Sequence, residues 1–186
     1  MAHGSLYLIT GPAGSGKQAL IDAALENRPD IRRAPLIVSS DSAHRICEAG
    51  TISPDRFLDL MHRDTFALQW DSEGARYGMT HDATRILARG QSLILCCDTS
   101  VIEQARALYP NVRAIYITAR MDVLRRRLAL MAYGSDIEID MHLAQSDRFR
   151  PRDAETVMVD TSDSIAAGAR TLMNAFPAAQ DEMRPK

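Results

Sequence analysis

The residues best suited to chemistry form a glycine-rich segment near the start of the chain, from Gly11 to Lys17. This segment fits the pattern G-x-x-x-x-G-K and lies between an expected strand at 5–10 and an expected helix at 17–26. Its glycines allow backbone angles that turn several N–H groups into one concavity, and the following helix N-terminus favours an anion. Lys17 adds a positive charge that would reach the outer phosphates of a nucleotide. The pattern predicts a loop that binds ATP or a close relative.

The expected nucleotide-binding residues are Gly11, Pro12, Ala13, Gly14, Ser15, Gly16, Lys17 and Gln18. The last position usually carries Ser or Thr, whose hydroxyl binds Mg²⁺, so Gln18 alters the metal site. Asp98 ends an apolar strand, where a carboxylate commonly contacts the metal or its water shell, although a strand-ending Asp is also often a cap. Lys17 and Asp98 are therefore the candidate catalytic residues. ATP and Mg²⁺ are the expected cofactors, and no metal site made of protein ligands alone is expected.

Short apolar runs alternate with helical segments, which predicts a parallel sheet covered by helices on both faces. A hairpin with a four-residue turn at 71–74 interrupts this alternation, and 39–51 is expected to be mostly loop. Ser53 before Pro54 signals a helix start, and Ser100 with Glu103 fits a capping box. Strands are expected at 5–10, 34–38, 66–70, 75–78, 93–97, 112–118 and 156–159, and helices at 17–26, 54–61, 80–90, 100–109, 121–131, 136–149 and 165–175.

Composition limits the class of protein. With 186 residues and 46% hydrophobic content, the chain can build one well-covered core. Its 22 Lys and Arg residues against 24 Asp and Glu argue against a general binder of nucleic acid or of anionic membranes. Cys47, Cys96 and Cys97 lack metal-ligand spacing and are expected to be buried thiols. No basic leader or long apolar stretch is present, which predicts a cytoplasmic protein with a small-molecule partner.

From Gly11 to about Ala175 the order of elements resembles the guanylate-kinase-like group of nucleoside-monophosphate kinases. The segments that match one branch of that group best are Phe66–Trp70, Gly74, Arg76–Gly78, Ile86–Gly90, Gln104–Ala107, Tyr109–Pro110, Val123–Leu124 and Arg127–Leu128. They are similar to the ribose 1,5-bisphosphate phosphokinase family of phosphonate breakdown. That resemblance implies transfer of the γ-phosphoryl group of ATP to the 1-phosphate of ribose 1,5-bisphosphate, which yields phosphoribosyl diphosphate.

The resemblance also implies an organisation and a set of acceptor-binding residues. It predicts one P-loop kinase-like unit over 1–186, with an acceptor-binding insertion at about 34–79, a short lid at about 131–149 and a loose tail at about 177–186. Tyr77 matches a tyrosine that donates its hydroxyl to the acceptor's phosphate, although a half-buried hairpin aromatic is the alternative. Ser40 and Arg45 lie in the expected acceptor loop. Leu68 replaces the glutamate with which guanylate kinase reads guanine, so a guanine site is not expected.

Several departures remove positive charge that phosphoryl transfer uses. The family's Arg-x-x-Thr-Arg is Leu36–Ser40 here, its lid Arg-Gly-Arg-Glu is Met131–Gly134, and an arginine in the next helix becomes His142. Two alternatives therefore stay open: a catalytically weakened nucleotide-binding module that serves a partner protein, and a kinase whose acceptor carries no phosphate. Local arginines offer substitutes, although surface charges are the simpler interpretation: Arg32, Arg33, Arg45, Arg125, Arg126, Arg148 and Arg150.

Overall fold

The computed structural model describes residues 3–39, 50–72, 74–148 and 150–177. Their centre is a sheet of five strands in the order β2-β7-β1-β8-β9, in which all neighbours pair in parallel. The sheet contains β1 (Leu6–Thr10), β2 (Ile31–Arg33), β7 (Ser92–Cys96), β8 (Val112–Thr118) and β9 (Val157–Asp160). β1 is buried over its whole length, as expected of a strand covered on both faces.

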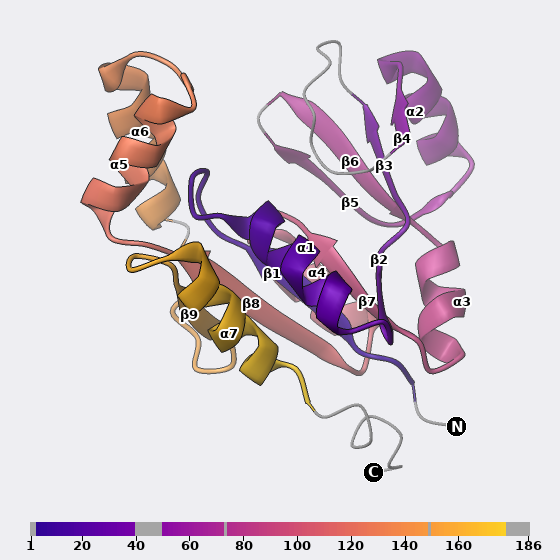
Figure 1. Cartoon of the computed structure of the whole chain (residues 1–186). Helices are drawn as coiled ribbons and strands as arrows, with labels where there is room; N and C mark the ends of the chain where they lie inside the picture. Colours follow the sequence, from indigo (N-terminus) through magenta and orange to yellow (C-terminus); the bar gives the residue numbers. More distant parts are fainter. Residues whose placement is uncertain (1–2, 40–49, 73, 149, 178–186) are drawn as a thin grey trace.

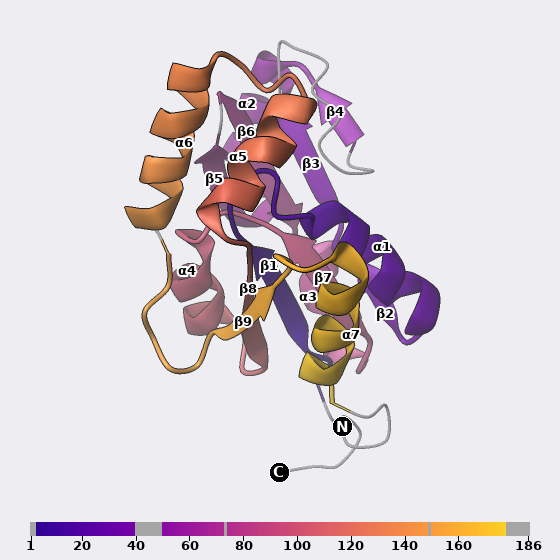
Figure 2. The same ribbon diagram turned by 60° about the vertical axis from the view of Figure 1, so that its left-hand side comes forward.

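Helices cover the two faces because side chains alternate along each strand. Leu6 and Leu8 of β1 belong to one cluster with α3 (Asp82–Ala88) and α4 (Val101–Leu108). Tyr7 and Ile9 point the other way, into a cluster with α1 (Lys17–Asn27) and α7 (Ile165–Ala175). Figures 1 and 2 show α1 and α7 side by side on one face, with α3 and α4 beyond the strands. The expected parallel sheet between two helical layers is confirmed.

A second, smaller sheet stands beside the first, in the order β4-β3-β6-β5 (Figure 1). It consists of β3 (Leu36–Ser39), β4 (Gly50–Ile52), β5 (Phe66–Ser72) and β6 (Ala75–Thr80), and α2 (Pro54–His62) joins β4 to β5. Along β5, buried and more exposed residues alternate almost strictly, so one face packs inward and the other meets solvent. The inward face joins the cluster that α3 and α4 cover.

The helices α5 (Met121–Leu130) and α6 (Asp136–Arg148) form a pair at the C-terminal side of the central strands (Figure 2). Val123, Leu124 and Leu128 of α5 pack against Ile139 and Leu143 of α6. Ala13 of the glycine-rich loop packs against the same cluster. The base of the helix pair is therefore attached directly to that loop.

Local differences from the sequence expectations have simple causes. The strand expected at 34–38 corresponds to β3, whereas β2 precedes it as an unexpected short strand that belongs to the other sheet. The strand β4 lies largely in a stretch expected to be loop, and the hairpin strands extend beyond the expected ends until Ser72 pairs with Ala75. Ser53 caps α2 as predicted, since its Oγ accepts from the Arg56 N–H. Among the described residues no helix is long and apolar enough to cross a membrane.

Candidate functional site

The glycine-rich loop adopts backbone angles that require its glycines. Gly11, Gly14 and Gly16 have φ values of 134°, 76° and 89°. A Cβ at Gly11 would lie 2.0 Å from the Ile117 carbonyl oxygen, and a Cβ at Gly16 would lie 2.3 Å from Cδ1 of Ile165. Side chains at these positions would therefore be strained and would also collide with the core. The loop wraps closely around the C-terminal end of β1, as a phosphate-binding loop must.

Lys17 folds back over this loop. Its Nζ donates hydrogen bonds to the carbonyl oxygens of Gly11 at 2.7 Å and Pro12 at 2.8 Å. The ammonium group is thereby held beside the concavity of the loop, and Lys17 is itself the first residue of α1. An anion bound here would meet both the lysine charge and the N-terminus of the helix.

A second set of hydrogen bonds braces the loop from behind. Arg127 of α5 donates to the carbonyl oxygen of Gly14 at 3.2 Å, to Thr161 Oγ1 at 2.9 Å and to the Thr161 carbonyl at 2.7 Å. Thr161 Oγ1 also lies 2.9 Å from the Ser15 carbonyl oxygen and 3.1 Å from that of Thr118. Thr161 is fully buried, so these bonds form in a medium that strengthens them. The loop is tied to α5 and to the segment after β9.

A cavity of about 570 Å³ opens in front of the loop. It joins the loop to the hairpin of the second sheet, to the ends of β7 and β8, and to α6. Its lining residues are Gly11, Pro12, Ala13, Lys17, Trp70, Asp71, Ser72, Tyr77, Cys96, Cys97, Asp98, Thr99, Tyr116, His142, Gln145 and Ser146. A cavity that combines a phosphate-binding loop with a second wall can hold a nucleotide tail and a further small molecule together.

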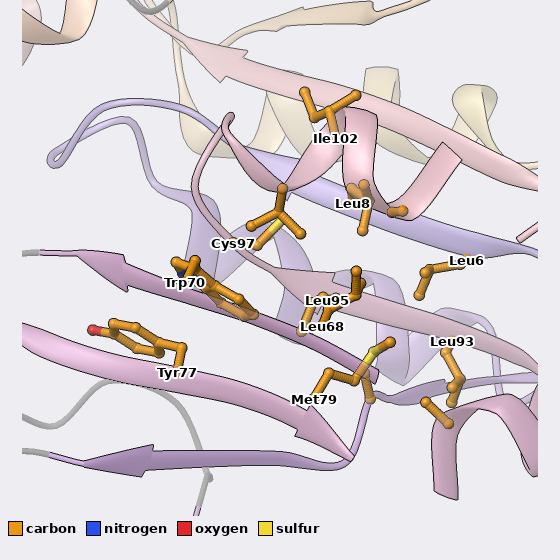
Figure 3. Close-up of a cluster of buried hydrophobic side chains, with 14 of the residues drawn as sticks. Leu6, Leu8, Leu68, Trp70, Tyr77, Met79, Leu93, Leu95, Cys97 and Ile102 are labelled. Carbon is orange, nitrogen blue, oxygen red and sulfur yellow. The ribbon is translucent and has the colours of Figure 1, made fainter. Parts of the chain in front are cut away.

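The hairpin wall presents an aromatic pair. Trp70 and Tyr77 are direct partners across β5 and β6, and their rings stack at a centroid distance of 5.2 Å and an angle of 9°. Figure 3 shows the pair beside Cys97, with Leu68 following along the same strand. Asp71 alternates to the opposite face of β5, where its carboxylate lies 3.5 Å from Arg76 Nε. The cavity therefore meets the aromatic rings on this wall, and Asp71, paired with Arg76, lines it as well.

The wall formed by α6 is polar. The Tyr133 hydroxyl lies 3.1 Å from His142 Nδ1, and the Tyr116 hydroxyl makes a long contact of 3.5 Å to the Ser146 carbonyl oxygen.

Burial keeps two ionisable groups of the cavity neutral. It raises the pKa of the Tyr116 phenol, so its hydroxyl stays protonated. Burial likewise raises the pKa of the Cys97 thiol well above its usual range, which keeps it neutral. Cys96 is half-buried, and Cys47 lies outside the described residues.

Asp98 follows the end of β7 and brings a carboxylate to the lining of the cavity. Its Oδ1 accepts from the Ser100 N–H at 2.9 Å, which replaces the capping box expected from Ser100 and Glu103. No group of three His, Cys, Asp or Glu side chains suited to a metal occurs in the described ranges. Mg²⁺ in nucleotide sites needs only one or two carboxylates besides the phosphates, so Asp98 fits such an ion. Gln18 does not line the cavity, and its Nε2 donates to Asp22 Oδ1 at 3.2 Å along α1.

The structure brings together only part of the predicted site. Lys17, Asp98 and Tyr77 line the same cavity as Gly11, Pro12 and Ala13, whereas Gly14, Ser15, Gly16 and Gln18 do not line it. Ser40 and Arg45 lie outside the described residues. The substitute arginines are partly engaged elsewhere: Arg33 pairs with Asp22, and Arg125 pairs with Asp136 and Asp140.

Sequence reasoning missed ten lining residues, namely Trp70, Asp71, Ser72, Cys96, Cys97, Thr99, Tyr116, His142, Gln145 and Ser146. Trp70 carried a usable signal, because it is the only tryptophan of the chain and alternates in phase with Leu68 on a hairpin strand. Tyr116, His142, Gln145 and Ser146 become neighbours only when α6 folds over the end of β8. No spacing in the sequence indicates that approach.

Comparison with solved structures defines the fold class of this protein. No protein-family profile matches the chain. Its fold is similar to that of guanylate kinase from Anaplasma phagocytophilum, with a TM-score of 0.68 at 15% identity over 98% of this chain and 88% of that one. A sugar kinase from Janibacter sp. HTCC2649 gives a TM-score of 0.55 at 12% identity, over 98% and 99% of the two chains. Fold and loop together define a P-loop protein with a guanylate-kinase-like fold.

Sequence comparison narrows this class to one family. The chain is 33% identical to ribose 1,5-bisphosphate phosphokinase PhnN of Pseudomonas fluorescens over 96% of its own length and 90% of that protein. It is 27% identical to the protein of the same name from Agrobacterium fabrum, over 97% and 100% of the two chains. The chain belongs to the ribose 1,5-bisphosphate phosphokinase family.

Proposed function

We propose that this protein transfers the γ-phosphoryl group of ATP to the 1-phosphate of ribose 1,5-bisphosphate and so forms phosphoribosyl diphosphate in phosphonate catabolism. An oxygen of the acceptor's 1-phosphate attacks the γ-phosphorus, and the bond from that phosphorus to the bridging oxygen of ADP breaks. The observation that carries the proposal is the single cavity between the Lys17 loop and the Trp70–Tyr77 hairpin. Reaction in line requires donor and acceptor to meet in one such space.

Each wall has a role in this proposal. Lys17 and the loop hold the β- and γ-phosphates, and Tyr77 donates its hydroxyl to an acceptor phosphate. Asp98 would hold Mg²⁺ or its water shell, and the ion would supply positive charge that offsets the charge of the phosphates. The unit spans 1–186, with the second sheet in the acceptor-binding insertion of about 34–79 and α6 in the lid of about 131–149. Ser40 and Arg45 remain proposed acceptor-binding residues on the basis of their position in the chain.

A second candidate function rests on the lid. Met131 is 65% exposed and uncharged, and Tyr133 is engaged with His142, at positions for which the family resemblance predicted arginine. Transition-state charge on a transferring phosphoryl group is commonly offset by arginine, and its loss costs several orders of magnitude in rate. A nucleotide-binding module with little turnover, acting through a partner protein, is therefore the alternative.

One experiment separates these functions. Purified protein is incubated with ATP, Mg²⁺ and ribose 1,5-bisphosphate, and the reaction is followed by ³¹P NMR for the new diphosphate signal. GMP serves as a second acceptor and should remain unphosphorylated, because Leu68 is buried and cannot accept hydrogen bonds from guanine. Lys17→Ala is the catalytic control. Formation of phosphoribosyl diphosphate supports the kinase, whereas ATP binding by calorimetry without any transfer supports the weakened module.

A further inference from the structure

Trp70 is a large donor-bearing side chain in the cavity to which the reaction scheme above gives no role. Its side chain is 8% exposed, yet it lines the cavity opposite the phosphate-binding loop. Indole Nε1–H can only donate, and a buried tryptophan normally finds an acceptor for it. Within the part of the chain that the structure describes, no residue accepts a hydrogen bond from this N–H. A donor on a mostly buried side chain that reaches the cavity, and that has no acceptor among the described residues, is suited to a ligand oxygen.

The environment of Trp70 restricts where this donor can point. The indole stacks nearly parallel on Tyr77, its direct partner in the ladder, so the two rings hold each other in register. In Figure 3 the indole nitrogen and the Tyr77 hydroxyl lie on the side of the pair away from Leu68 and Leu95. Those leucines and Met79 are almost fully buried, so the opposite end of the pair is closed. Both polar atoms are therefore held at the same end of a rigid unit.

We propose that Trp70 is a specificity-determining residue, whose indole N–H and the neighbouring Tyr77 hydroxyl together donate to one phosphate group of the sugar acceptor. Two neutral donors can bind an anionic oxygen without the desolvation cost of burying two arginines. A stacked pair that is already packed in place also loses little entropy on binding. This inference deepens the proposed function and rests on the second sheet being its acceptor side.

The first test uses the fact that Trp70 is the only tryptophan of the chain. Tryptophan emission of the wild-type protein therefore reports on this side chain alone. Titration with ribose 1,5-bisphosphate or with ribose 5-phosphate, in the absence of nucleotide, should change the emission and saturate. Calorimetry under the same conditions measures binding independently. Binding detected by heat without any change in emission would overturn the proposal, and so would the absence of binding by either sugar phosphate.

The second test removes the N–H and keeps an aromatic ring. Trp70→Phe should raise the KM for ribose 1,5-bisphosphate about tenfold, the expected effect of one hydrogen bond to a charged group, with kcat and the KM for ATP nearly unchanged. Phe57→Leu is the matched control, because Phe57 is a buried aromatic of the same region that stacks on Phe66 and does not line the cavity. If Trp70 has only a structural role, Trp70→Phe should behave like Phe57→Leu: the melting temperature should fall and the acceptor KM should not change.

These two tests separate the Trp70 contact from the proposed kinase function. A change in emission with a sugar phosphate, without product in the ³¹P NMR assay, would retain the Trp70 contact and refute the kinase. Product formation with unchanged emission and an unchanged acceptor KM in Trp70→Phe would retain the kinase and refute the contact. Equal acceptor KM increases in Trp70→Phe and Phe57→Leu would also refute it.

Discussion

Replacing Thr161 by valine should loosen the phosphate-binding loop without changing the shape of the core. The Thr161 hydroxyl is buried, accepts from Arg127 at 2.9 Å and lies within 2.9 Å of the Ser15 carbonyl oxygen. Valine has nearly the same volume but neither donates nor accepts. Each lost hydrogen bond contributes about 1 kcal/mol, and the groups left buried without that partner add a similar penalty, so we expect a loss of about 2–3 kcal/mol.

The assay is thermal and chemical denaturation of the purified protein, followed by calorimetric titration with ATP. For a domain of this size the loss corresponds to a fall in melting temperature of roughly 5–10 °C. Affinity for ATP should fall several-fold, because the loop carbonyls that Thr161 and Arg127 hold are free to move. Thr171→Val is the control: its hydroxyl bonds to the Ala167 carbonyl on an exposed helix face, and its removal should change stability by less than about 0.5 kcal/mol. An equally small effect at Thr161 would refute the bracing role.

Three further predictions test other parts of the molecule. Lys17→Ala should weaken ATP binding about tenfold or more, because it deletes a charged donor beside the loop, and wild-type protein that fails to bind millimolar nucleotide in calorimetry would contradict the site itself. Met131→Arg with Tyr133→Arg should raise kcat by about tenfold, because the added charges offset transition-state charge, while the acceptor KM stays high. A wild-type protein that already turns over at about 1–100 per second would show that other cations fill the role of the lid arginines. The hydrogen bond from Arg28 lowers the pKa of Asp30, so this carboxylate stabilises the fold above its unfolded pKa of about 3.9. The deficit in melting temperature of Asp30→Asn should therefore shrink as the pH falls below that value, and a deficit that is independent of pH would contradict the ion pair.

Much of the central fold could be predicted because it depends on local signals. The apolar runs of β1, β7 and β8 are buried on both sides, so hydrophobicity alone locates them. Ser53 and Pro54 locate the start of α2 through capping chemistry that acts within one turn. The phosphate-binding loop was equally predictable, since its glycines are required by φ angles that other residues rarely adopt.

Tertiary contacts decided the remainder. Pro35 marks a local break between β2 and β3, but which sheet each strand joins is decided by contacts with distant strands. Ser100 and Glu103 have the spacing of a capping box, but the Ser100 N–H donates its hydrogen bond to Asp98 Oδ1 instead. The cavity wall from α6 forms only because Leu128, Ile139 and Leu143 pack the helix pair against the loop. Residue types and short spacings therefore determined the phosphate chemistry, whereas the acceptor wall arises from contacts between segments far apart in the chain, whose energies no local pattern encodes.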